Sequence, residues 1–160
     1  MASLTIFAGP NGSGKSSIIG GGPFAGSDHL LEADAIALRI YPDQPKLAAI
    51  AAGREVLRRT QEYLSAGEDF AIETTLSGNW TRLAVTQALA RSFFVRLVYV
   101  CLESPERCIW RVRERVAEGG HDVPDEDVRR RYSRAWRLFR SCYASQMKVL
   151  STIIPNSSRS

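Results

Sequence analysis

Apolar residues gather in short runs along the chain, and each run has the length expected of a buried strand. Such runs lie at residues 4–8, 70–72, 95–102 and 149–154, and the one at 95–102 is the most strongly β-forming. A shorter apolar run in the stretch HLLEADAIA indicates another strand and a turn, with Asp34 just beyond it. The pattern therefore predicts a sheet of about five strands.

Between these runs, apolar residues recur at the three- and four-residue spacing of amphipathic helices. We expect helices over 45–66, closed by Gly67, over about 80–91 and over 105–118. The acidic triplet at 125–127 suits the first turn of another helix, where negative charge favours the dipole. Strands that alternate with helices form a mainly parallel sheet covered on both sides. The prediction is therefore a three-layer α/β/α fold.

The first apolar run leads directly into the sequence GPNGSGKSS, residues 9–17. Its spacing, Gly9-x-x-x-x-Gly14-Lys15-Ser16, is the Walker A pattern, in which backbone N–H groups surround phosphate oxygens. The alternative is a plain glycine loop between a strand and a helix, which the complete spacing in this context disfavours. We therefore predict a P-loop NTPase fold with a nucleotide site.

Each position of this loop has a physical role in holding phosphate. The glycines let the backbone approach an anion closely, Lys15 adds a point charge, and the Ser16 hydroxyl is placed to ligate Mg²⁺. The start of the following helix presents further N–H groups to the anion. The predicted nucleotide-binding residues are Gly9, Pro10, Asn11, Gly12, Ser13, Gly14, Lys15, Ser16 and Ser17.

Polar residues also lie at the carboxyl ends of other predicted strands, where ligands bind in folds of this class. Asp34 is the candidate carboxylate that orients or deprotonates an acceptor hydroxyl; its alternative role is a helix cap at the start of AIAL. Glu73 and Thr75 are candidates for hydrogen bonds to the acceptor, or else they belong to a turn that only ends a strand. We expect these residues and the phosphate loop to converge on one crevice.

The segment 107–140 is rich in arginine and contains no lysine. Arg111 and Arg115 are four residues apart and share a helix face, and Arg131 follows a glycine-rich break. This arrangement suits a lid that closes over phosphates, so we predict a helical, arginine-rich lid over about 107–134, with Arg111 as a candidate for contacting the substrate. A nucleic-acid surface is the competing interpretation. It is disfavoured because the arginines are interleaved with an apolar seam that must pack.

The composition is typical of one soluble globular domain over residues 1–160, with 44% hydrophobic residues and a formal net charge of +4. The chain contains no apolar run long enough to span a membrane, and its first residues lack the features of a signal peptide. The three cysteines are odd in number and form no C-x-x-C pair. They indicate reduced thiols and a cytoplasmic location.

Several stretches occur in an order that is far more specific than the phosphate loop alone: GPNGSGKSS, EADAIA, AAGREVL, IETTLSG and RVRERVAEGGHDVPDEDVRRRY. With this set, residues 1–140 resemble the zeta-toxin family of P-loop kinases, especially its short chromosomal branch of predicted ATPases. The resemblance implies a kinase with a lid, ATP and Mg²⁺ as cofactors, and an antitoxin protein as a partner. It also implies roles for Asp34 as catalytic carboxylate, Glu73 and Thr75 near the acceptor, and Arg115 and Arg131 as charge stabilisers.

The expected function is ATP-dependent transfer of the γ-phosphate to a hydroxyl of a small acceptor. In characterised members of that family the acceptor resembles a UDP-activated amino sugar, so the enzyme would act either as a toxin or in sugar-nucleotide metabolism. The alternative is a P-loop ATPase or nucleotide-binding switch, in which the acceptor is water. No aspartate follows the strand at 95–102 like a Walker B carboxylate, so we expect the metal to rely on Ser16 and Asp34.

Overall fold

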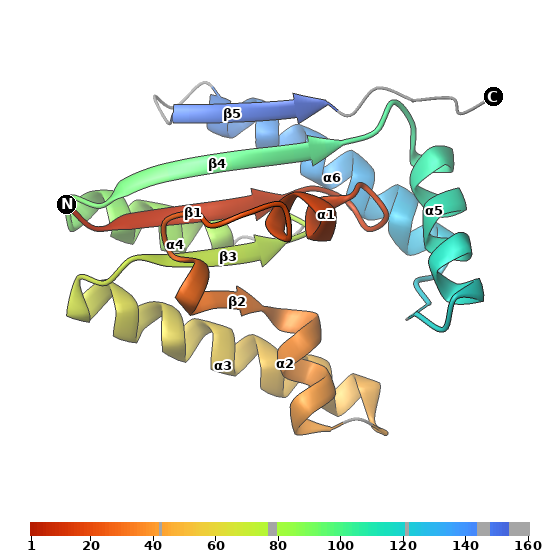
Figure 1. Cartoon of the computed structure of the whole chain (residues 1–160), viewed down its shortest axis with the longest axis horizontal. Helices are drawn as coiled ribbons and strands as arrows, with labels where there is room; N and C mark the ends of the chain where they lie inside the picture. Colours follow the sequence, from red (N-terminus) through yellow and green to blue (C-terminus); the bar gives the residue numbers. More distant parts are fainter. Residues whose placement is uncertain (42, 77–79, 121, 144–147, 154–160) are drawn as a thin grey trace. The chain divides into compact units, whose positions relative to one another are not determined.

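The computed structural model describes residues 1–41, 43–76, 80–120, 122–143 and 148–153 of the 160-residue chain. The strands are β1 (Ser3–Ala8), β2 (Leu30–Glu32), β3 (Phe70–Thr74), β4 (Phe94–Cys101) and β5 (Lys148–Ile153) (Figure 1). The helices are α1 (Lys15–Ile19), α2 (Ala33–Ile40), α3 (Pro45–Ala66), α4 (Trp80–Ala90), α5 (Pro105–Ala117) and α6 (Asp125–Tyr143), with a short 3-10 helix, η1 (Ser27–His29).

The described strands form a five-stranded sheet in the order β2-β3-β1-β4-β5. β2 and β3 pair in parallel, with Leu31 opposite Ile72 and Glu32 opposite Glu73. The predicted α/β fold, with about five strands, is therefore confirmed, and the expected element bounds agree with the structure to within a few residues. One difference is that β2 ends at Glu32 and α2 begins directly, so the stretch around Asp34 is helical where a turn was expected.

The chain packs as two compact units, and β1 and β4 contribute residues to both. Unit 1 consists of residues 1–6, 23–74 and 79–96, and unit 2 consists of residues 7–22, 75–78 and 97–160. The chain passes from one unit to the other within each of these two strands. A single domain over residues 1–160 stays a prediction.

Unit 1 has an aromatic core beside β3. Phe70 is fully buried; its ring lies 5.5 Å from that of Tyr63 in α3 and 6.0 Å, edge to face, from that of Phe93. Hydrogen bonds join the start of β1 to the residue before β3. The backbone N–H and the hydroxyl of Ser3 both donate to Asp69 Oδ1, at 2.7 and 2.9 Å. These contacts fix β1 against the start of β3.

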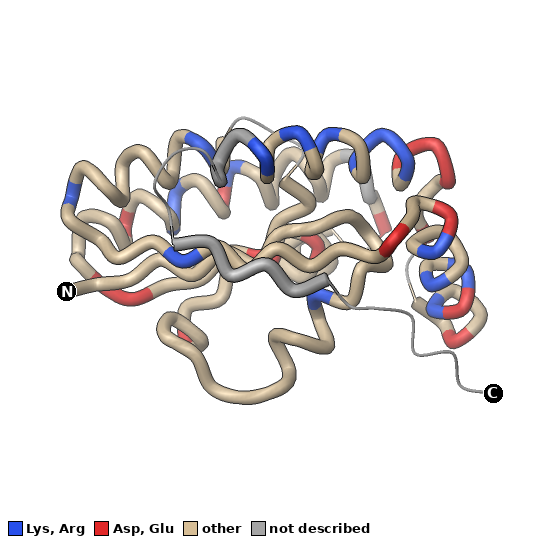
Figure 2. The backbone as a smooth tube through the Cα atoms, turned by 90° about the horizontal axis from the view of Figure 1, so that it is seen from above, with Lys and Arg blue, Asp and Glu red and all other residues tan. Residues whose placement is uncertain are grey.

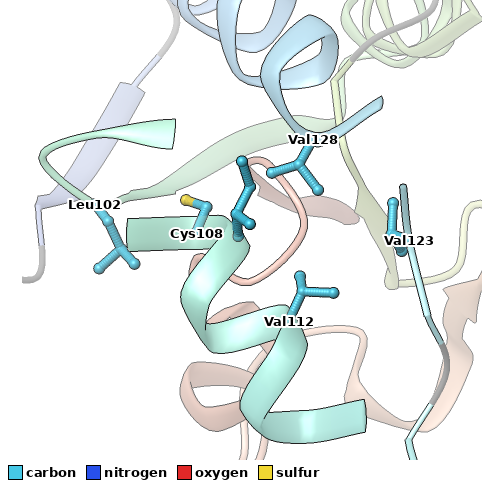
Figure 3. Close-up of a cluster of buried hydrophobic side chains, with 6 residues drawn as sticks. Leu102, Cys108, Val112, Val123 and Val128 are labelled. Atoms are coloured by element: carbon cyan, nitrogen blue, oxygen red, sulfur yellow. The ribbon is translucent and has the colours of Figure 1, made fainter. Parts of the chain in front are cut away.

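Unit 2 is held by an apolar cluster between the end of β4, α5 and α6. Its buried members are Leu102, Cys108, Ile109, Val112, Val123 and Val128 (Figure 3). Tyr132 of α6 packs on this cluster and donates its hydroxyl to the carbonyl oxygen of Leu102, at 2.8 Å. The cluster and this bond set the positions of α5 and α6 beside the phosphate loop, which belongs to the same unit.

Candidate functional site

The phosphate loop adopts backbone conformations and close contacts that require glycine. Gly12 has φ +76°, and a Cβ there would collide with the carbonyl oxygen of Cys108 in α5. Gly9 has φ +152°, and a Cβ there would collide with the carbonyl oxygen of Val100 in β4. The loop is therefore pressed against both β4 and α5, and only a residue without a side chain fits at these two positions.

Lys15 is buried within the same loop, although it carries a charge. Only 6% of the residue is exposed, and its Nζ donates to the carbonyl oxygens of Gly9 and Pro10, at 2.9 and 3.0 Å. A buried ammonium is tolerated because these oxygens accept its hydrogen bonds. The loop consequently encloses a positive charge next to its own backbone N–H groups, which is the arrangement that binds phosphate.

Two serines complete the loop in different ways. Ser13 is fully buried, and its Oγ lacks a hydrogen-bond partner among the residues that the structure describes. An unpaired buried hydroxyl is costly, and a bound anion is a partner that would remove this cost. Ser16 and Ser17, in the first turn of α1, are exposed, so the Ser16 hydroxyl is accessible to a metal ion.

One arginine of α6 reaches the phosphate loop. Nη1 of Arg131 donates to Oδ1 of Asn11, at 2.9 Å, across 120 residues of sequence. Asn11 is buried and Arg131 is half-buried. The structure thus brings together two residues that the sequence suggested separately, one in the phosphate loop and one in the predicted lid.

Ion pairs join α5 to the first turns of α6. Arg113 pairs with Asp125 at 2.6 Å and Arg129 pairs with Glu106 at 3.4 Å. Acidic residues thus lie among the arginines of α5 and in the first turn of α6 (Figure 2). The carboxylates partly neutralise the arginines. Because a nucleic-acid surface depends on uncompensated positive charge, these pairs weaken that interpretation further.

Arg115 lies at the end of α5, against the glycine-rich break. Its carbonyl oxygen accepts the backbone N–H of Gly120 at 2.9 Å, and a Cβ on Gly120 would come within 2.6 Å of its Cγ. The predicted end of the helix is therefore confirmed, with Gly119 at φ +89°. Arg111 is exposed, one turn earlier on the same helix.

Three carboxyl groups gather at the carboxyl ends of β2 and β3 in unit 1. Glu32 and Glu73 are opposite each other in the sheet register, and Asp34 follows in the first turn of α2. Burial, then the charge of Glu73, then the charge of Asp34 raise the pKa of Glu32 above its ordinary value. Sequence reasoning missed Glu32; the strand register that pairs it with Glu73 is not encoded in any local motif.

The start of α2 shows whether Asp34 has its alternative role as a helix cap. The N-cap position of α2 is Glu32, and this position makes no side-chain capping bond. Asp34 is an exposed residue two positions further on. The structure therefore does not place Asp34 at the cap, and its carboxylate is free to face solvent or a ligand.

The predicted residues divide between the two compact units. Residues 9–17, Thr75 and the three candidate arginines belong to unit 2, whereas Asp34 and Glu73 belong to unit 1. Glu73 lies within β3 and Thr75 directly after it, as expected. Convergence of both groups on one crevice stays a prediction.

The buried thiols of unit 2 carry no evident chemistry. Cys101 and Cys108 are free and buried. Burial, and next the neighbouring Cys101, raise the pKa of the Cys108 thiol to about 12. A thiol with this pKa stays protonated near neutral pH and is a poor nucleophile.

Comparison with known proteins places the chain in a family. A family model described as "AAA domain" matches residues 4–138. The chain belongs to this AAA domain family. A curated protein of Haemophilus influenzae, described as "Uncharacterized protein", is 33% identical over 127 residues, which is 79% of this chain and 90% of that protein.

Two solved structures share the fold of this AAA domain chain. The first, described as a "putative kinase" from Chloroflexus aurantiacus, has a TM-score of 0.70 at 15% identity and covers 99% of this chain and 91% of its own. The second comes from the PezAT chromosomal toxin-antitoxin system of Streptococcus pneumoniae; its TM-score is 0.57 at 17% identity, over 74% of this chain and 54% of its own. The AAA domain chain thus has the P-loop kinase fold, and the zeta-toxin resemblance is borne out to that level.

The residues of the AAA domain chain fit a nucleotide with Mg²⁺. The glycine contacts, the enclosed ammonium and the unpaired Ser13 hydroxyl suit phosphate, and Ser16 offers an accessible oxygen. Among the described residues, no cluster of three or more His, Cys, Asp or Glu side chains could hold a metal ion. A Mg²⁺ ion here would accordingly be shared with phosphate oxygens and water. In the described part of the chain, no helix is long and apolar enough to cross a membrane.

Proposed function

We propose that this chain is an ATP-dependent small-molecule kinase that transfers the γ-phosphoryl group to an acceptor hydroxyl. The observation that carries the proposal is the bond from Arg131 to Asn11, which sets a guanidinium of the arginine-rich helix against the phosphate loop. Phosphoryl transfer depends mostly on positioning and on neutralising charge. A loop that encloses Lys15, with an arginine from another helix beside it, supplies both.

The division of roles follows from the chemistry of each group. The backbone N–H groups of residues 9–17 and the Lys15 ammonium hold the phosphates, and Ser16 ligates Mg²⁺, which when bound neutralises phosphate charge. Arg131 and Arg115 neutralise the charge on the moving phosphoryl group. Asp34 accepts the proton of the acceptor hydroxyl while that oxygen bonds to the γ-phosphorus and the bond to the leaving ADP oxygen breaks.

The acceptor is bound, in this proposal, by Glu73, Thr75 and Arg111. The two glutamates and Asp34 at the ends of β2 and β3 form a polar surface that suits a hydroxyl-rich molecule. A UDP-activated amino sugar is the first acceptor to test, since the zeta-toxin resemblance implies it. An antitoxin protein is proposed as a partner on the same resemblance, supported by the structural likeness to a protein from a toxin-antitoxin system.

A screen of acceptors tests the function. Purified protein is mixed with Mg²⁺, ATP and hydroxyl-bearing metabolites that include UDP-activated amino sugars, and products are measured by mass. One acceptor that gains a single phosphoryl group supports the proposal. Phosphate released to water at the same rate with every acceptor would favour the ATPase alternative. Lys15→Met, which keeps the aliphatic stem, should weaken ATP binding about 10- to 100-fold in calorimetry.

Asp34→Asn separates binding from transfer. The amide cannot accept the hydroxyl proton, so turnover should fall about 100- to 10,000-fold while ATP affinity stays nearly constant. Asp28→Asn, a second exposed aspartate of unit 1, is the matched control and should leave turnover unchanged. Normal turnover in Asp34→Asn would remove Asp34 from the reaction.

A further inference from the structure

The bond between Asn11 and Arg131 gives the phosphate loop a contact that its Walker A pattern does not require. Asn11 occupies one of the unspecified positions of Gly9-x-x-x-x-Gly14-Lys15-Ser16. Its side chain is nevertheless enclosed, with 8% of the residue exposed, and its amide oxygen accepts a hydrogen bond from Arg131 at 2.9 Å. The buried side-chain amide of Asn11 therefore has a specific hydrogen-bond partner, Arg131.

Arg131 is held from two sides. Its Nη2 lies 3.9 Å from Oδ2 of Asp127, one helical turn earlier, and its Nη1 is bonded to Asn11 at the shorter distance of 2.9 Å. Asp127 is also engaged by Arg130 at 2.6 Å. The amide of Asn11 is thus the closer of these two anchors, and it directs the guanidinium towards the loop.

The elements around this bond are in close contact with one another. Gly12, next to Asn11, is pressed against the carbonyl of Cys108 in α5, and α5 packs on α6 through the apolar cluster that includes Val112 and Val128. The phosphate loop therefore contacts α5, and α5 contacts α6. The hydrogen bond from Arg131 to Asn11 adds a direct contact between α6 and the phosphate loop.

An amide suits this place better than a carboxylate would. An amide oxygen orients a guanidinium through one hydrogen bond and leaves its positive charge in full. A carboxylate would neutralise that charge and would also repel phosphate oxygens in the same loop. The chemistry of the pair thus preserves the charge that an arginine needs beside a transferring phosphoryl group.

We propose that Asn11 is a positioning residue, which holds the Arg131 guanidinium in place to stabilise the transferring phosphoryl group. This inference rests on the proposed kinase function and deepens it. Asn11 acts through Arg131, so its loss should weaken binding of the transition state and spare binding of the product nucleotide. The backbone and Lys15, which hold the phosphates of the nucleotide, are unchanged by that substitution.

The test compares ADP with ADP and aluminium fluoride, a mimic of the transferring phosphoryl group, both with Mg²⁺ and measured by calorimetry. It needs no acceptor. In Asn11→Ala, ADP affinity should stay within about twofold, whereas affinity for the fluoride complex should fall about tenfold, the loss expected for one hydrogen bond to a charged group. Arg131→Ala should lose more, and the double variant should be no weaker than Arg131→Ala alone.

Arg137→Ala, on an exposed position of α6, is the matched control, and its effect should simply add to that of Asn11→Ala. Equal losses for ADP and the fluoride complex in Asn11→Ala would show a general role in loop structure and overturn the inference. Additive losses for Asn11 and Arg131 would overturn it as well. A wild-type protein that binds neither ligand would reject the kinase function itself, which distinguishes the two failures.

Discussion

At the scale of single residues, the phosphate loop can be tested by adding one methyl group. In Gly12→Ala the new Cβ meets the carbonyl oxygen of Cys108 in a left-handed backbone conformation. We expect a loss of about 1–3 kcal/mol in the free energy of unfolding. Gly53→Ala is the matched control, because that glycine lies inside α3 with open space around its Cβ position. Gly53→Ala should raise the free energy of unfolding by about 0.5–1 kcal/mol, measured by urea unfolding. Similar effects of the two substitutions would contradict the close packing of Gly12 against Cys108.

Glu32 gives a prediction about pH. Burial and the charges of Glu73 and Asp34 raise its pKa in the folded protein, so the folded state binds this proton more tightly than the unfolded state does. The ionised form therefore costs stability, and the cost develops as the pH rises from the ordinary carboxyl pKa through the raised one. Glu32→Gln should raise the unfolding midpoint at about pH 8 more than at about pH 4.

A second substitution checks the cause of that effect. With Glu73→Gln already present, one of the neighbouring charges is gone, and the gain from Glu32→Gln at the higher pH should shrink. A gain from Glu32→Gln that is the same at both pH values would show that folding does not raise the pKa of Glu32. A gain at the higher pH that Glu73→Gln leaves unchanged would show that the two carboxyl groups do not interact. Thermal unfolding followed by circular dichroism provides the measurement.

At the scale of elements, the arginines of α5 and α6 should divide into two classes. If Arg115 and Arg131 act on phosphates within a closed lid, alanine at either position should lower turnover on the order of a thousandfold. Arg137→Ala and Arg140→Ala, on exposed positions of α6, should change turnover little. Four equal reductions, or a changed salt dependence of nucleic-acid binding, would contradict the kinase interpretation of this segment.

The elements also show why some features were predictable and others were not. α3 was predicted with its observed bounds because Pro45 and Gly67 mark its ends locally, and the phosphate loop was predictable because its glycines and lysine lie within a few residues. Asn11 and Arg131 are 120 residues apart, and Glu32 meets Glu73 only through the strand register. Such pairs depend on packing, which no local pattern in one sequence encodes.

At the scale of the whole molecule, the two compact units raise the question of whether they unfold separately. The chain passes between them within β1 and within β4, so each of these strands supplies residues to both units. A strand that loses its pairing in one unit disturbs the other through the continuous backbone. We therefore expect a single cooperative transition, as is usual for a domain of this size.

The tryptophans provide a reporter for each unit. Trp80 belongs to unit 1, and Trp110 and Trp136 belong to unit 2, so variants that keep one set and replace the other with phenylalanine report on the units separately. Val128→Ala removes two methyl groups from the buried cluster of unit 2 and should cost about 2 kcal/mol. Because unfolding is expected to be cooperative, this loss should lower the urea midpoint seen by Trp80 as much as that seen by Trp110 and Trp136. A shift confined to the unit 2 reporters would instead show two independently folding domains.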